Sequence, residues 1–403
     1  MDRNIYKKID PYKCPSPSFV VDEEDLENNL KILDSVQRRT GCRILLAQKG
    51  FAMFHFYPLI RKYLCGVCAS GLHEARLGRE EFKGEVHTYS PAFRDEEFDE
   101  IAGISDHIVF NSFSQLEKFR FRADKIRADR ARSGSASEAG RSSSEVKPEL
   151  GIRVNPEHSE TETALYDPCR PGSRLGVTID NFEEDKLEGV SGLHFHTLCE
   201  KNADSLERTL KVFESKFERF IGRMKWINFG GGHHITREDY DIDLLCRLIT
   251  DFQSRYGTKV YLEPGEAVAL DTGVLVATVL DIVHNGGSIA LLDASASNHM
   301  PDVIEMPYRP MIIGSGLGGE KKYNYTIGGT SCLAGDIIGS YSFDTPLKPG
   351  DRLIFTDMAH YSMVKTTTFN GVPLPAITAC RSSEGIYKVI RNFGYEDFRM
   401  RLS

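Results

Sequence analysis

The chain has 403 residues, of which 40% are hydrophobic, and its formal net charge is −8. This length suits one large or two medium domains with a sizeable core. The acidic balance, with no prominent basic stretch, argues against nucleic acid as the main partner. The first ten residues hold no apolar segment, and no apolar run reaches about 18 residues, so we expect neither a secretory signal nor a membrane span.

Nine cysteines, an odd number, are scattered along the chain. This usage favours a reducing cytoplasm over a disulfide framework. Cys65 and Cys68 form a CxxC pair, but the pair lies in an apolar run and no second pair exists. We therefore interpret both as reduced core cysteines.

The predicted elements begin with a short strand at 18–21, followed by a helix that Asp22 can cap. Short apolar runs then alternate with helical patterns. This alternation predicts parallel pairing, and eight strands in a row favour a closed (β/α)8 barrel over an open sheet. The predicted barrel strands lie at 43–48, 64–69, 85–89, 107–110, 150–154, 191–196, 225–229 and 259–262. The helical patterns lie at 52–63, 71–80, 94–103, 113–127, 202–222 and 237–256.

One segment interrupts the alternation. Residues 128–148 are poor in apolar side chains and rich in Ser, Gly and charge, which is typical of a disordered surface insertion. After about residue 273, strands follow one another without long helices and are separated by turns such as 285–287, which predicts an antiparallel β domain. We expect the strand at 18–21 to join it.

The predicted fold is therefore an α/β chain with a TIM-like (β/α)8 barrel and a mostly antiparallel β domain. The barrel is predicted at 24–272, with the insertion at about 128–148. The β domain is predicted to combine 1–23 with 273–403.

Chemistry collects at the ends of the predicted barrel strands, where the active site of such a barrel lies. The first strand delivers Lys49, an amine that can act as a nucleophile. Taken alone, this stretch fits a strand-end lysine that faces water better than it fits a nucleophilic lysine. The fifth strand carries Arg153, and the sixth holds His194 and His196.

The last two strands end in glycine-containing turns. Gly230, Gly231 and Gly232 follow the seventh strand, and Glu263-Pro-Gly-Glu266 follows the eighth. At this position in a barrel, such turns commonly hold a phosphate through backbone N–H groups. An amine, a phosphate cradle, an imidazole and a carboxylate are the groups that pyridoxal phosphate needs.

A metal site is the competing interpretation. His194 and His196 lie two residues apart on a strand, His233 and His234 follow the next strand, and barrel hydrolases bind metals with His-x-His pairs. In those enzymes the pair lies on the first strand and the lysine comes later, which is the reverse of the order here. We therefore expect no metal and interpret His194 as a buried structural residue.

Eight motifs, in this order, carry a resemblance to a known family. They are LAQK at 46–49, GIRVNP at 151–156, SRLG at 173–176, GLHFHTLCE at 192–200, NFGGGHH at 228–234, LEPGE at 262–266, GTSCLAGD at 329–336 and DMAHY at 357–361. With them the chain resembles the fold-type III (alanine racemase-like) pyridoxal-phosphate decarboxylases, the group of ornithine and diaminopimelate decarboxylases. Within that family it is most similar to the carboxynorspermidine and carboxyspermidine decarboxylases. The resemblance implies decarboxylation to norspermidine or spermidine in polyamine biosynthesis.

The resemblance also implies roles for individual residues. Lys49 would carry pyridoxal phosphate covalently, His196 would stack on its ring and Glu263 would pair with its pyridine nitrogen. Cys332 or Lys49 would return the proton to the product. The implied catalytic residues are Lys49, His196, Glu263 and Cys332. The implied cofactor-binding residues are Lys49, Arg153, His196, Gly230, Gly231, Gly232, Glu263, Gly265 and Tyr361.

A homodimer with two shared active sites follows from the same resemblance, because Cys332 and Asp336 would reach the active site of the partner subunit. Two departures from the family pattern concern the substrate. Glu266 stands where relatives acting on ornithine or diaminopimelate commonly have Arg, and Leu333 stands where diaminopimelate decarboxylases have an acid. Both changes disfavour a second substrate carboxylate and favour a polyamine tail.

Four acidic residues are candidates to meet such a tail, although the segment that holds two of them, Asp302 and Glu305, equally fits a solvated loop. The candidates are Glu266, Asp302, Glu305 and Asp336. The alternatives are diaminopimelate decarboxylase, another fold-type III amino-acid decarboxylase or a racemase of the same cofactor class. A catalytically inactive pyridoxal-phosphate-binding partner protein should have lost Lys49 or Cys332, and both are present.

Overall fold

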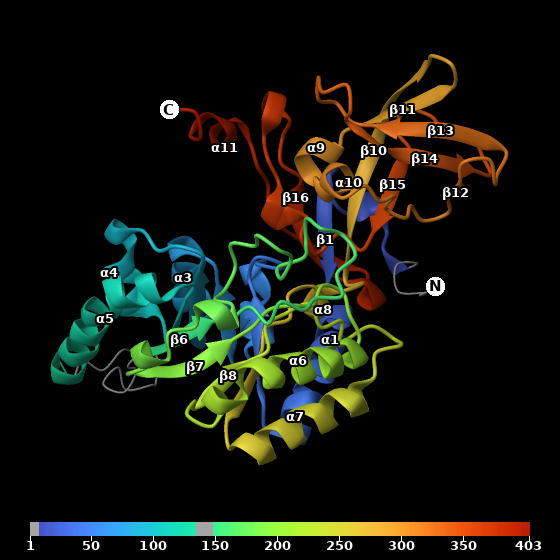
Figure 1. Cartoon of the computed structure of the whole chain (residues 1–403). Helices are drawn as coiled ribbons and strands as arrows, with labels where there is room; N and C mark the ends of the chain where they lie inside the picture. The colour runs from blue at the N-terminus through green and yellow to red at the C-terminus, as the bar shows by residue number, and fades with distance from the viewer. Residues whose placement is uncertain (1–7, 134–147) are drawn as a thin grey trace. The chain divides into compact units, whose positions relative to one another are not determined.

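The computed structural model describes residues 8–133 and 148–403. The chain divides into two compact units. The barrel unit is Leu30–Val268, and the β unit combines Met1–Asn29 with Ala269–Ser403. Each unit is described by itself below (Figure 1).

The barrel unit holds a closed barrel of eight parallel strands (Figure 1). Pairing of the first strand with the last, in the register Ile44↔Leu262, closes the barrel. This confirms the predicted (β/α)8 barrel, since every predicted barrel strand overlaps an observed one. The strands are β2 (Arg43–Ala47), β3 (Gly66–Ala69), β4 (Glu85–Ser90), β5 (His107–Phe110), β6 (Glu149–Arg153), β7 (Val190–His194), β8 (Trp226–Asn228) and β9 (Lys259–Leu262).

The helices of the barrel bury one apolar face each. In α6, Leu206, Leu210, Phe213 and Phe217 are buried at spacings of three or four residues, as an amphipathic helix requires. Among the described residues, none of the helices is both long and apolar enough to cross a membrane. The helices are α1 (Glu23–Thr40), α2 (Tyr57–Ile60), α3 (Leu72–Leu77), α4 (Asp95–Ile104), α5 (Phe113–Ser133), α6 (Ala203–Ile221), α7 (Ile242–Tyr256) and α8 (Glu266–Ala269).

The predicted start of the insertion at residue 128 is wrong. Helix α5 continues to Ser133, because its Ala- and Arg-rich end consists largely of good helix formers. Pro148, at the other end of the predicted insertion, is buried just before β6. The rest of the predicted insertion, 134–147, lies outside the described residues.

Aromatic rings fill part of the barrel interior. The rings of His87 and His107 stack at 3.8 Å between centroids, and Trp226 stacks on His107 at 4.7 Å. Two glycines make room for the indole. A Cβ on Gly192 would lie 2.1 Å from a ring atom of Trp226, and one on Gly151 would lie 2.4 Å away. Neither position accommodates a side chain, so these glycines and Trp226 depend on one another.

The β unit is built on a nine-stranded, mostly antiparallel sheet. Strand β1 pairs with β10 and β16, so the N-terminal strand joins this sheet as expected. The buried core on the sheet includes Phe19, Leu275, Tyr341 and Phe355. The strands are β1 (Ser18–Asp22), β10 (Gly273–His284), β11 (Ser288–Leu292), β12 (Gly316–Leu317), β13 (Tyr323–Gly328), β14 (Ile337–Phe343), β15 (Arg352–Thr356), β16 (Ala376–Arg381) and β17 (Ile386–Arg391).

Several elements of the β unit were not predicted. Strand β12 has only two residues. Strand β17 lies largely exposed at the edge of the sheet, and its sequence has no continuous apolar run. The short helices α9 (Ala296–His299), α10 (Asp302–Glu305) and α11 (Tyr395–Arg399) span too few residues to show a helical period.

The buried His87 makes the stability of the barrel depend on pH. Burial and then the charge of Arg43 lower the pKa of His87 from 6.5 to about 3. As pH falls between these values, the unfolded chain binds a proton at this residue and the folded chain does not. The free energy of unfolding therefore decreases toward low pH, by up to about 1.4 kcal/mol per pH unit for this residue.

We predict that His87→Asn makes the free energy of unfolding less steeply dependent on pH between 6.5 and about 3. Urea denaturation across this range measures the slope. The control variant His73→Asn, at an exposed position, should show the same slope as wild type. An unchanged slope in His87→Asn would contradict a buried neutral imidazole.

Candidate active site

The barrel strands bring the predicted barrel residues to one end of the barrel. Because the strands are parallel, their carboxyl ends meet there. Arg153, His194 and Asn228 are the last residues of β6, β7 and β8, and Glu263 follows β9. Lys49 follows β2 and is exposed, although the strand before it is buried. An exposed amine thus lies at the same end as a set of buried polar groups.

Glu263 carries a largely buried carboxyl, with 12% of its side chain exposed. The side-chain amide of Asn228 donates to Glu263 Oε1 at 2.6 Å, and His194 Nε2 lies 3.6 Å from Oε2. Burial raises the pKa of Glu263, while the Asn228 hydrogen bond and the charge of Lys49 oppose the rise. A buried carboxylate of this kind is stabilised by a cationic partner.

Sequence reasoning missed two neighbours of Glu263. Asn228 belongs to a quoted motif, but it had no predicted role, and its contact with Glu263 joins the ends of two adjacent strands. The Cys68 thiol lies against the same carboxylate, and burial raises the pKa of Cys68 well above its ordinary value. Cys68 is therefore a core cysteine that also contacts the site, a position that CxxC spacing alone does not reveal.

His196 is held in one orientation and in one protonation state. Its Nδ1 accepts a hydrogen bond from the amide of Gly231 at 2.9 Å, so the ring proton lies on Nε2. Burial lowers the pKa of His196 well below its ordinary value, and the nearby charges of Lys49 and Arg153 lower it further. The ring is therefore neutral. Arg153 donates to the carbonyl of His196 at 3.4 Å and lies over the ring of Tyr89.

The three consecutive glycines after β8 have a steric role. A Cβ on Gly231 would lie 2.4 Å from the carbonyl oxygen of Glu263, and one on Gly232 would lie 1.9 Å from that of Leu198. Gly230 and Gly232 also have positive φ angles, of 71° and 82°. The glycines thus let the loops after three neighbouring strands approach one another.

Two of these glycines donate hydrogen bonds from their backbone amides to side chains of the same chain. Gly230 donates to Asn228 Oδ1 at 2.8 Å, and Gly231 donates to His196. The same turn therefore orients the groups on both sides of it. Among the glycines predicted to hold a phosphate, Gly232 and Gly265 are better placed to offer amides to a ligand than these two.

The carboxylate of Glu266 lies at the start of α8, where its Oε1 is 3.0 Å from Nε2 of His234. Glu200, His234 and Glu266 together form a group of three potential metal ligands. Their ligand atoms all lie within 4.8 Å of one another. This is the only such group among the described residues, and it does not contain the His194–His196 pair that the metal interpretation considered. Glu200 had no predicted role, and His234 was named only in the metal interpretation.

The predicted residues of the β unit differ in what their side chains do. Cys332 is exposed, and its amide donates to Asn370 Oδ1 at 2.7 Å. Asp336 is buried and accepts hydrogen bonds from the hydroxyls of Ser295 and Ser331, at 2.8 and 2.6 Å. Its carboxylate thus orders the turn that carries Cys332. Tyr361 has a positive φ of 48°.

Asp302 and Glu305 share one internal partner. The ammonium of Lys365 pairs with both carboxylates, and lies 2.9 Å from that of Glu305. The segment is the short helix α10 rather than a loop. Lys365 offsets one of the two negative charges and pairs with both carboxylates, so a polyamine would have to compete with Lys365 to bind there.

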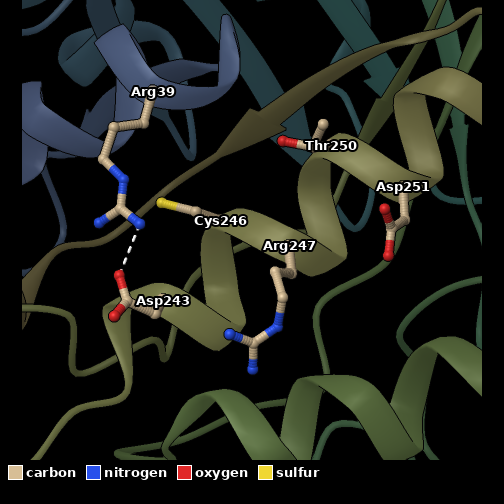
Figure 2. A pocket seen from close by; sticks show the side chains of 6 residues that line it. All are labelled: Arg39, Asp243, Cys246, Arg247, Thr250 and Asp251. Carbon is tan, nitrogen blue, oxygen red and sulfur yellow. Dashed lines mark hydrogen bonds and ion pairs between the residues drawn. The ribbon is translucent and has the colours of Figure 1, made fainter.

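A pocket elsewhere in the barrel unit contains none of the predicted site residues. Figure 2 shows it between the end of α1 and one side of α7, with Arg39 and Asp243 joined at 2.6 Å across it. Its lining residues are Arg39, Asp243, Cys246, Arg247, Thr250 and Asp251. The pocket lies along the outer helices and not at the strand ends.

An amine, a buried carboxylate and a fixed neutral imidazole at the strand ends of a barrel, in a chain that also has an antiparallel β unit, define the class of barrel enzymes that use pyridoxal phosphate. The family described as "Pyridoxal-dependent decarboxylase, C-terminal sheet domain" matches residues 18–359. The chain belongs to this pyridoxal-dependent decarboxylase family. The predicted family and the predicted carboxy-lyase class are confirmed.

Two relatives are similar over nearly their whole length. The carboxynorspermidine/carboxyspermidine decarboxylase of Campylobacter jejuni is 43% identical, over 96% of this chain and 99% of that protein. The carboxyaminopropylagmatine decarboxylase of Synechocystis is also 43% identical, over 99% of this chain and 98% of that protein. Both relatives are named as decarboxylases of carboxylated polyamine-like compounds.

Solved structures show the same fold. A crystal structure of carboxynorspermidine decarboxylase from Campylobacter jejuni, complexed with norspermidine, matches with a TM-score of 0.85 and 41% identity, over 96% of this chain and 100% of that one. Diaminopimelate decarboxylase from Helicobacter pylori matches with a TM-score of 0.78 at 15% identity, which shows the fold alone.

We predict that Asn228→Ala weakens pyridoxal phosphate binding about tenfold, because Glu263 loses its hydrogen-bond donor and ionises less readily. Titration of the cofactor-free protein, followed by the absorbance of bound cofactor, measures the affinity. Asn181→Ala is a suitable control, because among the described residues the exposed Asn181 side-chain amide donates only to the Thr178 hydroxyl. Equal affinity in wild type and Asn228→Ala would contradict the role of Asn228.

Proposed function

We propose that the chain decarboxylates carboxynorspermidine or carboxyspermidine and releases norspermidine or spermidine in polyamine biosynthesis. The observation that carries this proposal is the acidic Glu266, which lies among other polar groups in the loops at the strand ends of the barrel. A carboxylate suits the cationic tail of such a substrate. The similarity to the Campylobacter jejuni enzyme supports the same assignment.

The residues at the strand ends fit pyridoxal phosphate. The buried carboxyl of Glu263, whose pKa burial raises, suits a cationic ring nitrogen. The neutral, fixed ring of His196 suits stacking, and the exposed amine of Lys49 suits covalent attachment of the cofactor. The remaining proposed cofactor contacts are Arg153, Gly230, Gly231, Gly232, Gly265 and Tyr361.

Each of these residues then has a task in the reaction. Pyridoxal phosphate supplies the electron sink for the pair left on the α-carbon when carbon dioxide leaves. The negative charge of Glu263 would hold the proton on the ring nitrogen, and His196 would keep the ring in place. The α-carbon gains one proton, for which Lys49 and Cys332 are the proposed donors.

We further propose that the chain works in the cytoplasm as a homodimer with shared active sites. Exposed apolar side chains near Cys332, namely Leu333, Ile337 and Phe369, suit a protein–protein contact. The cysteines are all free in the structure, which suits a reducing compartment.

Of the four acidic residues proposed for the substrate tail, we retain Glu266. Asp336 orders its own turn, and Asp302 and Glu305 are both already paired with Lys365. Diaminopimelate is disfavoured, because Glu266 and Leu333 are poor partners for a second carboxylate. Carboxyaminopropylagmatine is a second candidate, since the similar Synechocystis protein is named for it and its guanidinium tail also suits a carboxylate.

Carbon dioxide release tests the proposal. Purified protein receives carboxynorspermidine, carboxyspermidine, carboxyaminopropylagmatine or diaminopimelate, each with and without added pyridoxal phosphate. We expect release from the first two. Release from the third alone selects the second candidate, and release from diaminopimelate alone contradicts the assignment. Bound cofactor without any release would indicate a catalytically inactive binding protein.

We predict that Lys49→Ala reduces decarboxylation to background, because the variant lacks the amine proposed to attach the cofactor. The same carbon dioxide assay measures the loss. Lys62→Ala, at an exposed position of the barrel unit, should retain wild-type turnover. Substantial decarboxylation by Lys49→Ala would refute the role of Lys49.

We predict that Glu266→Arg raises the KM of the polyamine-tailed substrate far more than it weakens cofactor binding. The new cation repels the substrate tail, whereas the proposed cofactor contacts remain. Substrate kinetics and cofactor titration of Glu266→Arg and Glu266→Gln separate the two effects, with the neutral variant expected to lie between wild type and Glu266→Arg. Losses of equal size in both measurements would count against this assignment.

A further inference from the structure

Glu200, His234 and Glu266 form a compact polar group, which we call the Glu–His–Glu group. His234 is 94% buried, since its exposed fraction is 6%, whereas Glu200 is exposed. The group therefore has a closed inner side and an outer side open to solvent. It consists of two carboxyl groups and one imidazole.

Backbone contacts between two loops build this group. The amide of Lys201 donates to the carbonyl of Gly232 at 3.0 Å, and the amide of His234 donates to the carbonyl of Lys201 at 3.2 Å. Glu200 itself has a positive φ of 53°, an unfavourable conformation for a residue with a Cβ. The loops after β7 and β8 thus hold the Glu200 and His234 backbones side by side, in a conformation with a local cost.

The imidazole of His234 has unused hydrogen-bonding capacity. Its Nε2 lies 3.0 Å from Glu266 Oε1, but not in hydrogen-bond geometry. Neither ring nitrogen has a hydrogen-bond partner among the residues described. Buried polar nitrogens normally find a partner, so this side chain points to a ligand that supplies one.

The group adjoins the proposed site of chemistry. Cys199 precedes Glu200, and the charges of both regions act on its thiol. Burial raises the pKa of Cys199 to about 11, the carboxylates of Glu200 and Glu266 raise it further, and the charge of Lys49 opposes the rise. Lys49 and the two carboxylates of the Glu–His–Glu group are therefore all close enough to act on the charge of this one half-buried thiol.

We propose that the Glu–His–Glu group binds an ammonium of the substrate's polyamine tail, and that Glu200 and His234, together with Glu266, determine specificity for tailed substrates. This inference rests on the proposed function. An ammonium donates three hydrogen bonds of about 2.9 Å, and in tetrahedral geometry its acceptors are about 4.7 Å apart. The acceptor atoms of the group all lie within 4.8 Å of one another, so they are close enough for one ammonium to reach all three.

A divalent metal is the competing ligand for the same three groups, and the surroundings disfavour it. A metal-bound histidine almost always donates its second ring N–H to an acceptor, which fixes the ring. His234 has no such acceptor among the residues that the structure describes. An ammonium makes no comparable demand, because the imidazole can accept a single hydrogen bond from it.

The test compares Glu200→Gln and His234→Leu with wild type, using cofactor-loaded protein. Glu207→Gln on α6, whose glutamate pairs with Lys211, is the matched charge control. Calorimetry with norspermidine should show an affinity about tenfold lower in both variants, and KM for the tailed substrate should rise by a similar factor while kcat is retained. Glu200→Asp should recover part of the affinity, and the bound-cofactor absorbance should not change in any variant.

Two results would overturn the inference. Norspermidine affinity and KM equal to wild type in both variants would show that the group does not meet the tail. Stoichiometric Zn²⁺ or Mn²⁺ binding that is lost in the same variants, with norspermidine affinity retained, would assign the group to a metal. If the proposed function itself were wrong, wild-type protein would release no carbon dioxide from tailed substrates. This result is distinguishable from both outcomes above.

Discussion

Closure of the parallel barrel is the constraint on which the rest of the candidate site depends. Pairing of β2 with β9 brings Lys49 and Glu263, which are more than 200 residues apart in the chain, to the same end of the barrel. Glycines at the crowded positions make this closure sterically possible, both against Trp226 inside the barrel and between the loops at its end. The chemistry of the site therefore follows from how the strands pack.

At the strand ends of the barrel, the polar residues are linked to one another by hydrogen bonds. Asn228 joins Glu263 to the glycine turn, and Gly231 joins the turn to His196. Each hydrogen bond fixes an orientation or a protonation state before any ligand is present. Preorganised groups of this kind do not have to reorganise when the substrate arrives. The buried carboxyl of Glu263 is thus oriented toward its proposed task by its neighbours.

Much of the fold could be predicted, because buried parallel strands are continuous apolar runs and the helices between them show a clear period. Lys49, His196 and Glu263 could be chosen because they stand at strand ends. The contacts of Glu263 with Asn228 and Cys68 could not be predicted, because these partners lie on other strands. The pairing of Asp302 and Glu305 with Lys365 was hidden for the same reason, since about 60 residues separate them. The Glu–His–Glu group depends on contacts between loops, which local sequence patterns do not encode.

The most direct test of the account is to locate the cofactor on the chain. Purified protein loaded with pyridoxal phosphate is reduced with borohydride, digested and analysed by mass spectrometry. The account predicts a single modified peptide with the cofactor's mass on Lys49. Modification of a different lysine, or a fully loaded protein with Lys49 unmodified, would contradict the claim that the barrel assembles its active site around this residue.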